Sequence, residues 1–283
     1  MTAVGPGGRP RGGPGGGPGE GPGEPEIIVV EDSDTASAVA AERIAGALVA
    51  SVAARGVAHW STTGGSTPGN IYRRLAEAGL RERVPWNRVH LWWGDDRWVP
   101  DTDILSNAVA CWDLLLRSVP VPTDQVHVMP IGKAIREGRS ASWAAGAYVE
   151  ELRAANLPLD DAGFPILDVI LIGIGSDGHI FSVFPGSATW NDPSWVQAVP
   201  APTHIAPHVE RVTLHPRVVD AARLPLAVVH GPSKSAIVGR IFGPRGDERE
   251  LPALLVRRQG AVWVLDEAAG AEIPPSLREP AIG

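Results

Sequence analysis

The chain has 283 residues, of which 44% are hydrophobic and 20% charged, and its formal net charge is −7. This composition is ordinary for a globular protein, and a net negative chain without a long basic run argues against binding to nucleic acid or acidic membranes. The single cysteine, Cys111, excludes an internal disulfide and a cysteine-built zinc site. We interpret Cys111 as a small buried side chain. A chain with one free cysteine fits a reducing compartment, so we expect a cytoplasmic protein.

Residues 1–25 consist largely of Gly and Pro. Such a segment buries too little apolar surface to offset its ordering entropy, so it is predicted to be a flexible tail. No apolar stretch approaches the roughly 20 residues that a membrane span needs, and the N-terminus lacks the apolar core of a signal peptide. Residues 26–283 are expected to form one domain that does not contact membranes.

Strand and helix patterns alternate along this domain. Strands are predicted at 27–30, 57–61, 88–94, 125–130, 167–175, 211–216, 224–231, 251–256 and 261–266. Helices are predicted at 32–56, 68–79, from about 106, and at 140–155 and 232–243. Because the strands are nearly continuous apolar runs separated by helices, they indicate an α/β fold with a mainly parallel sheet covered on both faces. A ligand site is then expected at the carboxyl ends of the strands.

The first polar cluster is the segment STTGGSTPG, which follows the second strand. Gly64 and Gly65 allow a tight turn, and Ser66 and Thr67 supply hydroxyl groups. Backbone amides at a helix start also collect anions such as phosphate. The segment therefore suits a phosphate or sugar, although an ordinary strand-to-helix turn with a threonine cap is an equal alternative.

The second cluster is GDDRWVPDTDILSN, in which Asp95, Asp96 and Arg97 directly follow a strand. Neighbouring side chains on a strand point to opposite sides, so the two carboxylates are not expected to form a paired acid and base. Arg97 suits an anionic ligand. One alternative is a solvated acidic loop in which Ser106 caps the next helix. Another alternative is a magnesium site formed by Asp95, Asp96, Asp101 and Asp103. It is less favoured because the spacing of these residues departs from the calcium-loop pattern.

The third cluster is GIGSDGHIFSVFPGS, residues 173–187. Of the eight histidines only His179 lies in such a glycine-rich turn, and an imidazole is largely neutral at physiological pH, as a general base must be. Asp177 lies two positions earlier and could orient the ring. A structural histidine is the alternative, and we interpret the other seven histidines as structural. Ser182 lacks the GxSxG context of a hydrolase nucleophile, so it is expected to pack or to form a hydrogen bond.

Two cations stand at strand ends of this net-negative chain. Arg211 opens a predicted strand, and Lys234 lies in the first turn of a predicted helix. Each is a routine surface charge by default, but together they would suit a phosphate group.

The chain resembles the 6-phosphogluconolactonase family over roughly residues 27–270. Six motifs carry the resemblance and occur in the family's order. They are GGSTP (64–68), GDDR with SN (94–97 and 106–107), GIGSDGHIFSVFPGS (173–187), RVTLHP (211–216), GPSK (231–234) and PALLV with VWVLD (252–256 and 262–266). Any one of these motifs is weak evidence, whereas all six in order are strong evidence.

The resemblance implies a three-layer, Rossmann-like α/β fold of the type shared with glucosamine-6-phosphate deaminases and ribose-5-phosphate isomerases. It implies hydrolysis of 6-phospho-D-glucono-1,5-lactone to 6-phosphogluconate, the second step of the pentose phosphate route, without a metal or organic cofactor. The expected partner is therefore a small phosphorylated sugar lactone, and the expected assembly is a monomer or small homo-oligomer.

The resemblance also implies roles for individual residues. His179 would be the general base that takes a proton from water, and Asp177 would orient it. Donors for the oxyanion would be backbone amides of the glycine-rich turns or Arg97, a choice that the sequence leaves open. Substrate and phosphate would be bound by Gly65, Ser66, Thr67, Asp95, Arg97, Asn107, Arg211 and Lys234.

The chain departs from the family pattern at three positions. Asp96 replaces the Glu of GDER, and Ser176 and Phe181 replace a Glu and a small residue of GEDGHTASLFP. We interpret these changes as variation around the site, although Phe181 could narrow the pocket. A sugar-phosphate deaminase or isomerase is one rival, but its related motif has Tyr in place of Arg97 and its histidine loop runs GHIAFNEP. A non-catalytic sugar-phosphate sensor is the other.

Overall fold

The computed structural model describes residues 23–277; residues 1–22, which are most of the predicted tail, and residues 278–283 lie outside the described part. The strands are β1 Glu26–Val30, β2 Ala58–Thr62, β3 Val89–Trp93, β4 Asp95–Arg97, β5 Val126–His127, β6 Val169–Ile172, β7 Val196–Val199, β8 Arg211–Leu214, β9 Leu224–Val229 and β10 Val262–Asp266. The α-helices are α1 Ser33–Arg55, α2 Ser66–Ala76, α3 Ala78–Arg83, α4 Asn107–Cys111, α5 Ile131–Arg136, α6 Ala141–Ala154, α7 Val218–Ala221 and α8 Ser235–Phe242.

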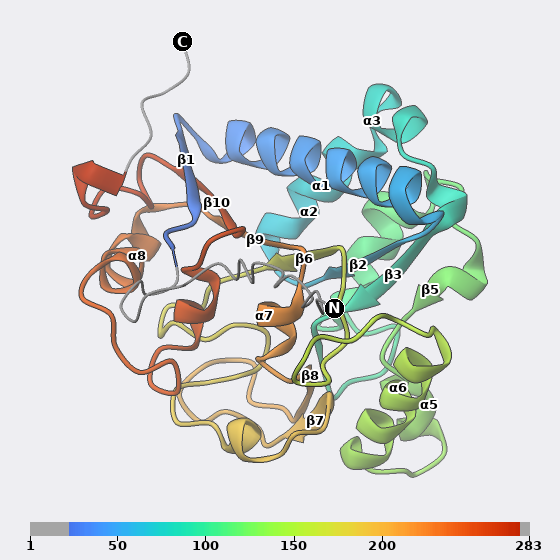
Figure 1. The fold of residues 1–283 in the computed structure, drawn as a ribbon. Coiled ribbons are helices and arrows are strands. Elements are labelled where there is room, and N and C mark those ends of the chain that lie inside the picture. The colour runs from blue at the N-terminus through green and yellow to red at the C-terminus, as the bar shows by residue number, and fades with distance from the viewer. Residues whose placement is uncertain (1–22, 278–283) are drawn as a thin grey trace, which may run out of the picture.

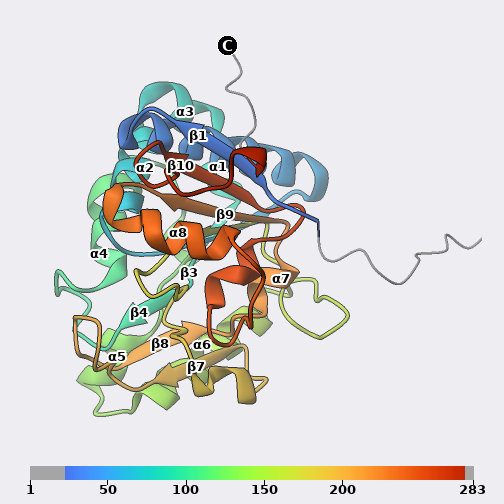
Figure 2. The same ribbon diagram turned by 90° about the vertical axis from the view of Figure 1, so that its left-hand side faces the viewer.

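Seven strands of the described residues form one sheet in the order β1-β10-β9-β6-β2-β3-β5. Every neighbouring pair in this sheet is parallel. Helices α1 and α2 cover one face, and α7 and α8 lie on the other (Figures 1 and 2). The predicted parallel α/β fold is therefore confirmed. The prediction succeeds because apolar strands such as Val169–Ile172 are buried along their whole length.

Helix α1 begins and ends where the sequence predicted. Oδ1 of Asp32 accepts a hydrogen bond from the backbone N–H of Thr35 at 2.8 Å, and Gly56 ends the helix in the left-handed conformation with φ of 79°. The helix is long and apolar enough to cross a membrane by length and composition, a feature that the sequence analysis did not recognise. It nevertheless packs on β10, β9 and β2, and its buried side chains, including Ile44 and Leu48, belong to the core.

A second sheet of the described residues has three antiparallel strands in the order β4-β8-β7. It lies beside α5 and α6 on the opposite side of the molecule from α1 (Figure 2). The prediction that residues 211–216 belong to the main sheet is therefore wrong, since Arg211–Leu214 lies in this small sheet. The expected loop after β3 also contains the three-residue strand β4.

The predicted strand at 251–256 is also wrong. Pro252–Val256 forms a 3-10 helix whose five residues are all buried. Proline lacks the backbone N–H that a central strand would donate, so this apolar run packs against the core without joining the sheet. The predicted burial of Cys111, by contrast, is confirmed.

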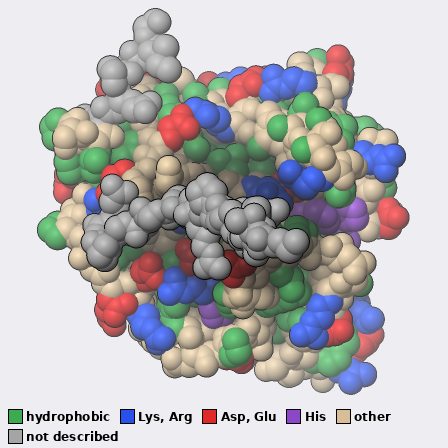
Figure 3. All heavy atoms as spheres, viewed as in Figure 1, with side chains coloured by type: hydrophobic (Ala, Val, Ile, Leu, Met, Phe, Trp, Pro, Cys, Tyr) green, Lys and Arg blue, Asp and Glu red, His purple; other side chains and the backbone are tan. Residues whose placement is uncertain are grey.

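Three histidines lie on neighbouring strands of the main sheet and stack on one another. Rings of His59 and His90 are 4.9 Å apart, and rings of His90 and His127 are 5.2 Å apart. A group of histidine side chains reaches the surface over β3 (Figure 3). Nε2 of His127 lies 2.9 Å from Nδ1 of His90, and Nδ1 of His127 lies 2.7 Å from Oε1 of Glu151. Their interpretation as structural residues agrees with these contacts.

Candidate active site

A pocket of about 560 Å³ lies where several strands of the main sheet end. Thr63 follows β2, Asp95 lies two residues after β3, Gly173 follows β6 and His230 follows β9, and all four line it. The pocket therefore occupies the carboxyl edge of the parallel sheet, where ligands of α/β proteins bind.

The structure brings most of the predicted site residues to this one pocket. Asp177 is not among the lining residues, but it is hydrogen-bonded to His179. Ser66 begins α2, and its side chain lies outside the described part of the structure. The predicted residues that line the pocket are Gly65, Thr67, Asp95, Arg97, Asn107, His179, Arg211 and Lys234.

His179 and Asp177, two positions apart in the sequence, form a hydrogen-bonded pair at the pocket wall. Nδ1 of His179 lies 2.6 Å from Oδ1 of Asp177, and the backbone N–H of His179 donates to the same oxygen at 3.1 Å. Burial alone would raise the pKa of Asp177, but hydrogen bonds from His179 and His204 lower it well below its usual range. An ionised carboxylate only accepts, so Nδ1 of His179 donates to it, and in the neutral form of the ring Nε2 then carries the lone pair.

Gly175 makes this pairing sterically feasible. A Cβ atom on Gly175 would lie 2.0 Å from Nδ1 of His179 and 2.7 Å from Oδ1 of Asp177. Both distances are far below contact range, so only glycine allows the two side chains to meet against this backbone. Gly175 of the third cluster therefore serves the approach of His179 to Asp177.

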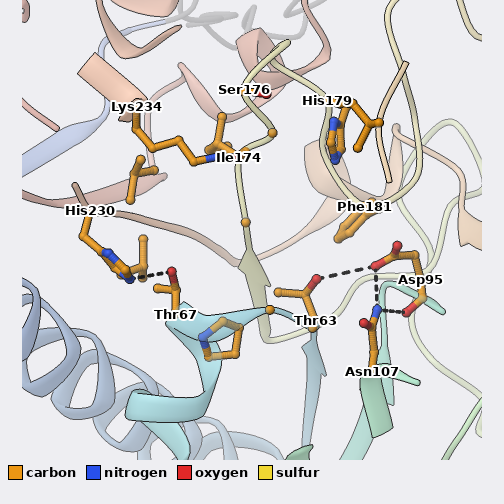
Figure 4. A pocket seen from close by; sticks show the side chains of 18 of the residues that line it. Thr63, Thr67, Asp95, Asn107, Ile174, Ser176, His179, Phe181, His230 and Lys234 are labelled. Carbon is orange, nitrogen blue, oxygen red and sulfur yellow. Dashed lines mark hydrogen bonds between the residues drawn. The ribbon is translucent and has the colours of Figure 1, made fainter. Parts of the chain in front are cut away.

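Asp95 lies at the centre of a buried hydrogen-bond network on the same side of the pocket as His179 (Figure 4). Oγ of Ser182 donates to Oδ2 of Asp95 at 2.6 Å. Nδ2 of Asn107 donates to the backbone carbonyl of Asp95 at 2.7 Å and to Oδ1 at 3.2 Å. The hydroxyl of Thr63 donates to Oδ1 at 3.4 Å. The expected hydrogen-bonding role of Ser182 is thus confirmed, and its hydroxyl helps to hold the Asp95 carboxylate in place.

Asp96 is bound by other donor atoms than Asp95, which agrees with the expectation that the two carboxylates do not form a pair. Its Oδ1 accepts from the backbone N–H of Asn107 at 2.7 Å, and its Oδ2 accepts from the hydroxyl of Ser106 at 2.9 Å. Burial raises the pKa of Asp96 to about 6, although these hydrogen bonds oppose the shift. Asp96 therefore fixes the start of α4, which places Asn107 in the pocket.

The four aspartates considered as magnesium ligands do not converge. Asp101 accepts from Nη1 of Arg136 at 2.6 Å, and Asp103 accepts from the backbone N–H of Leu105 at 2.9 Å. Within residues 23–277, no three His, Cys, Asp or Glu side chains are grouped so that they could hold a metal ion.

Lysine, histidine and arginine side chains stand at two places along the pocket. Lys234 and His230 lie on the side opposite His179 (Figure 4), where Nε2 of His230 is 2.7 Å from the hydroxyl of Thr67. Nζ of Lys234 donates to the carbonyl of Ile174 at 2.6 Å, and burial lowers the pKa of Lys234.

Arg97 and Arg211 form a cross-strand pair between β4 and β8, and both line the pocket. Burial lowers the pKa of Arg211. Within the described residues, the Nε atoms of Arg97 and Arg211 have no hydrogen-bond partner. A buried donor without a partner costs free energy, and a bound anion would supply the missing acceptor. The pocket is therefore chemically suited to an anionic ligand.

Sequence reasoning missed two histidines of this region. The sequence predicts structural roles for His230 and His204, yet His230 lines the pocket and Nε2 of His204 lies 2.9 Å from Oδ2 of Asp177. The position of His230 directly after an apolar strand was a signal that could have found it. No local pattern pointed to His204, which meets Asp177 across 27 positions of sequence.

Comparison with known proteins shows that the chain is similar to sugar-phosphate enzymes. Residues 31–264 match the family model described as glucosamine-6-phosphate isomerases/6-phosphogluconolactonase. The chain is 33% identical to a 6-phosphogluconolactonase of Streptomyces coelicolor, over 91% of this chain and 98% of that protein. It is 36% identical to a 6-phosphogluconolactonase of Mycobacterium tuberculosis, over 88% of this chain and 98% of that protein.

A solved structure gives the same result. The fold is similar to that of 6-phosphogluconolactonase from Trypanosoma cruzi, with a TM-score of 0.77 and 27% identity, over 88% of this chain and 96% of that one. The likeness therefore extends over most of this chain and nearly the whole of the matched one.

Proposed function

The chain belongs to the 6-phosphogluconolactonase family, and on this premise we propose that it hydrolyses 6-phospho-D-glucono-1,5-lactone with His179 as general base. The observation that carries the proposal is the pairing of His179 with Asp177 at 2.6 Å, in a pocket that Arg211 and Lys234 also line. This arrangement joins a proton acceptor to groups that attract a phosphate.

The proposed reaction starts from a neutral His179 whose Nδ1 proton is held by Asp177. Nε2 takes a proton from a water molecule as the water oxygen attacks the lactone carbonyl carbon. The carbonyl oxygen becomes an oxyanion, and the carbon–oxygen bond of the ring then breaks. The leaving ring oxygen receives the proton from Nε2 of His179, which yields a hydroxyl group and the acid. General-base assistance of this kind contributes about 10²–10⁴ in rate.

Asp177 supports both stages of this reaction. Its carboxylate holds the Nδ1 proton of His179, which keeps the lone pair on the nitrogen that acts. When His179 gains a second proton, the adjacent negative charge stabilises the imidazolium. The low pKa of Asp177 is consistent with this role, because the carboxylate stays ionised throughout.

Donors for the oxyanion are available from more than one element. Arg97 is partly anchored by Nη1, which donates to the carbonyl of Leu105 at 3.0 Å, and its Nε atom has no partner within the described residues. Gly64, Gly65 and Gly173 also line the pocket, and their backbone amides are further candidates. We propose that donors from this set stabilise the oxyanion.

The phosphate is proposed to bind away from the reacting carbon. Thr67 lies in the first turn of α2, whose backbone amides attract anions, and Lys234 faces the same part of the pocket (Figure 4). Arg211 supplies a second cation to the pocket. Anchoring the phosphate in this way would let remote binding energy hold the lactone against His179.

The rival functions fit these observations less well. A deaminase or isomerase of the same superfamily is disfavoured because Arg97 stands where the related motif has Tyr, and because Phe181-Ser182-Val183-Phe184 follows Ile180. A sensor without activity is disfavoured because His179, Asp177, Arg211 and Lys234 are all retained. We also propose that the protein acts in the cytoplasm, since its one cysteine is buried and free.

The direct test measures decay of freshly made 6-phosphogluconolactone with purified full-length protein. A coupled 6-phosphogluconate dehydrogenase would report product, and the spontaneous rate would be subtracted. We expect clear acceleration by the protein, and no release of ammonia from glucosamine-6-phosphate. The variant His179→Ala should keep its urea midpoint but lose most of the acceleration. Near-normal turnover by this variant would exclude His179 as the base.

A further inference from the structure

The second oxygen of Asp177 is held by a histidine from a different loop. Nε2 of His204 lies 2.9 Å from Oδ2 of Asp177, whereas His179 occupies Oδ1. The side chain of His204 is 50% exposed and that of Asp177 is 19% exposed, so the contact lies at the rim of the site. An ionised carboxylate only accepts, so both imidazoles donate to it.

Holding both oxygens restricts the carboxylate more than holding one. A carboxylate bound only through Oδ1 can still rotate about its Cβ–Cγ bond, and His179 would turn with it. The donor from His204 removes this freedom and thereby fixes the plane in which Nδ1 of His179 is held. The orientation of a catalytic group matters strongly, because small displacements from the reacting geometry cost large factors in rate.

The loop that carries His204 is itself tied down. It joins β7 to β8, and Nδ1 of His208 donates to the carbonyl of Pro202 at 2.7 Å. Nη2 of Arg211 donates to the carbonyl of Pro207 at 2.9 Å. Ile205, the neighbour of His204, lines the pocket. The loop is therefore built to present His204 at a defined place beside the site.

Phe184 fills the space between the two histidines. Its ring centroid lies 4.7 Å from that of His179 and 5.5 Å from that of His204, with an edge-to-face arrangement toward His204. The guanidinium of Arg211 lies 5.9 Å from the same ring. Packing against Phe184 orients the His204 ring, whereas the hydrogen bond to Asp177 requires its Nε2 atom, so the two contributions can be separated by substitution.

We propose that His204 is a positioning residue of the lactonase reaction, which acts through Asp177 on His179. The inference rests on the proposed role of His179 as general base. His204 need not contact the substrate; its contribution is to hold Asp177, and thus to set the orientation and the proton affinity of the His179 ring. Asp177 also interacts with Lys234, since its negative charge opposes the lowering of the Lys234 pKa by burial.

Two variants separate the hydrogen bond from the packing. His204→Phe keeps an aromatic ring beside Phe184 but has no donor, whereas His204→Gln keeps a side-chain N–H at a similar reach. We expect His204→Phe to lower kcat about tenfold, the scale of one lost hydrogen bond to a charged group. KM should stay within about twofold, because no substrate contact is lost, and His204→Gln should retain most of kcat.

The pH profile supplies a readout that a merely structural role would not move. With one donor fewer, the Asp177 carboxylate attracts the His179 proton more strongly, so His179 holds its second proton to higher pH. The acidic limb of kcat/KM should therefore move upward by roughly half a pH unit in His204→Phe. The limb of His204→Gln should lie near that of the wild type, and the urea midpoints of both variants should match it.

The outcomes distinguish this inference from the proposed function. If the wild type does not accelerate lactone decay, or if His179→Ala is fully active, the proposed function fails and the inference fails with it. If His179→Ala is inactive but His204→Phe shows wild-type kcat and an unmoved acidic limb, the positioning role alone is wrong. Equal losses in His204→Phe and His204→Gln would likewise overturn it, because the donor would then not be the relevant group.

Discussion

Gly175 stands so close to His179 that the two positions constrain each other, since a Cβ atom at 175 would lie 2.0 Å from Nδ1 of His179. The obstructing atom belongs to the ring that pairs with Asp177, so an added methyl must push the imidazole off the carboxylate. We expect Gly175→Ala to lower kcat about hundredfold, the usual result of displacing a catalytic group by about 1 Å. Steady-state lactonase kinetics check the prediction.

Gly46→Ala is the matched control for this substitution. Gly46 lies within α1 with open space around its Cβ direction, so alanine should leave kcat unchanged and stabilise the helix by roughly 0.5–1 kcal/mol. Retention of more than half of kcat by Gly175→Ala would show that the ring relocates without loss.

Lys234 and Arg211 are expected to act on substrate affinity. Removing one charged hydrogen-bond donor to the phosphate should raise KM by about 10–100-fold in Lys234→Met and in Arg211→Met, with a smaller effect on kcat. Arg240→Met, an exposed change on α8, is the control that alters net charge equally. If KM were unchanged in both pocket variants, the phosphate would have to bind elsewhere.

The main sheet could be predicted from the sequence because its strands are buried on both faces. Runs such as Val169–Ile172 and Val262–Asp266 are continuous apolar segments, and burial on both faces is what such segments indicate. The small sheet could not be predicted in the same way. Strand β4 is only Asp95–Arg97, and its three polar or charged residues have no strand-like pattern.

The site was predictable where its residues follow strands directly. Thr67, Asp95 and His179 stand in short polar segments after apolar strands, and the fold brings such segments to one edge. His204 was not predictable, because its place beside Asp177 depends on the path of the loop between β7 and β8, a strand pair that the sequence did not reveal. Ser182 shows the same limit, since its partner Asp95 is 87 positions away.

Ser182 is expected to contribute to stability through Asp95. Its hydroxyl donates to a carboxylate that is only 3% exposed, so its removal leaves a buried charge with one donor fewer. We expect Ser182→Ala to lower the free energy of unfolding by about 1–3 kcal/mol, measured by urea denaturation. Ser142→Ala, on the exposed side of α6, should change it by less than about 0.5 kcal/mol. Equal midpoints for the two variants would contradict this account.

Stability should fall as the pH is lowered from about 6 to 5. Burial lowers the pKa of His59 to about 4 and that of His215 to about 4, against an ordinary value of 6.5. In this interval the unfolded chain protonates both histidines and the folded chain protonates neither, which favours unfolding. Asp96 acts in the opposite direction, because its raised pKa of about 6 lets the folded chain bind a proton that the unfolded chain does not.

These three groups leave the unfolded chain with about one proton more than the folded chain, so together they lower the free energy of unfolding by roughly 1.4 kcal/mol per pH unit. Burial also lowers the pKa of His90, which acts in the same direction. Urea denaturation at pH 6.0 and 5.0 measures this slope. His215→Gln keeps an acceptor for the backbone N–H of Arg217, which donates to Nδ1 of His215 at 3.1 Å, but it cannot titrate. Its slope should therefore be flatter by about 1.4 kcal/mol per pH unit. A variant as pH-sensitive as the wild type would show that His215 gains its proton without unfolding.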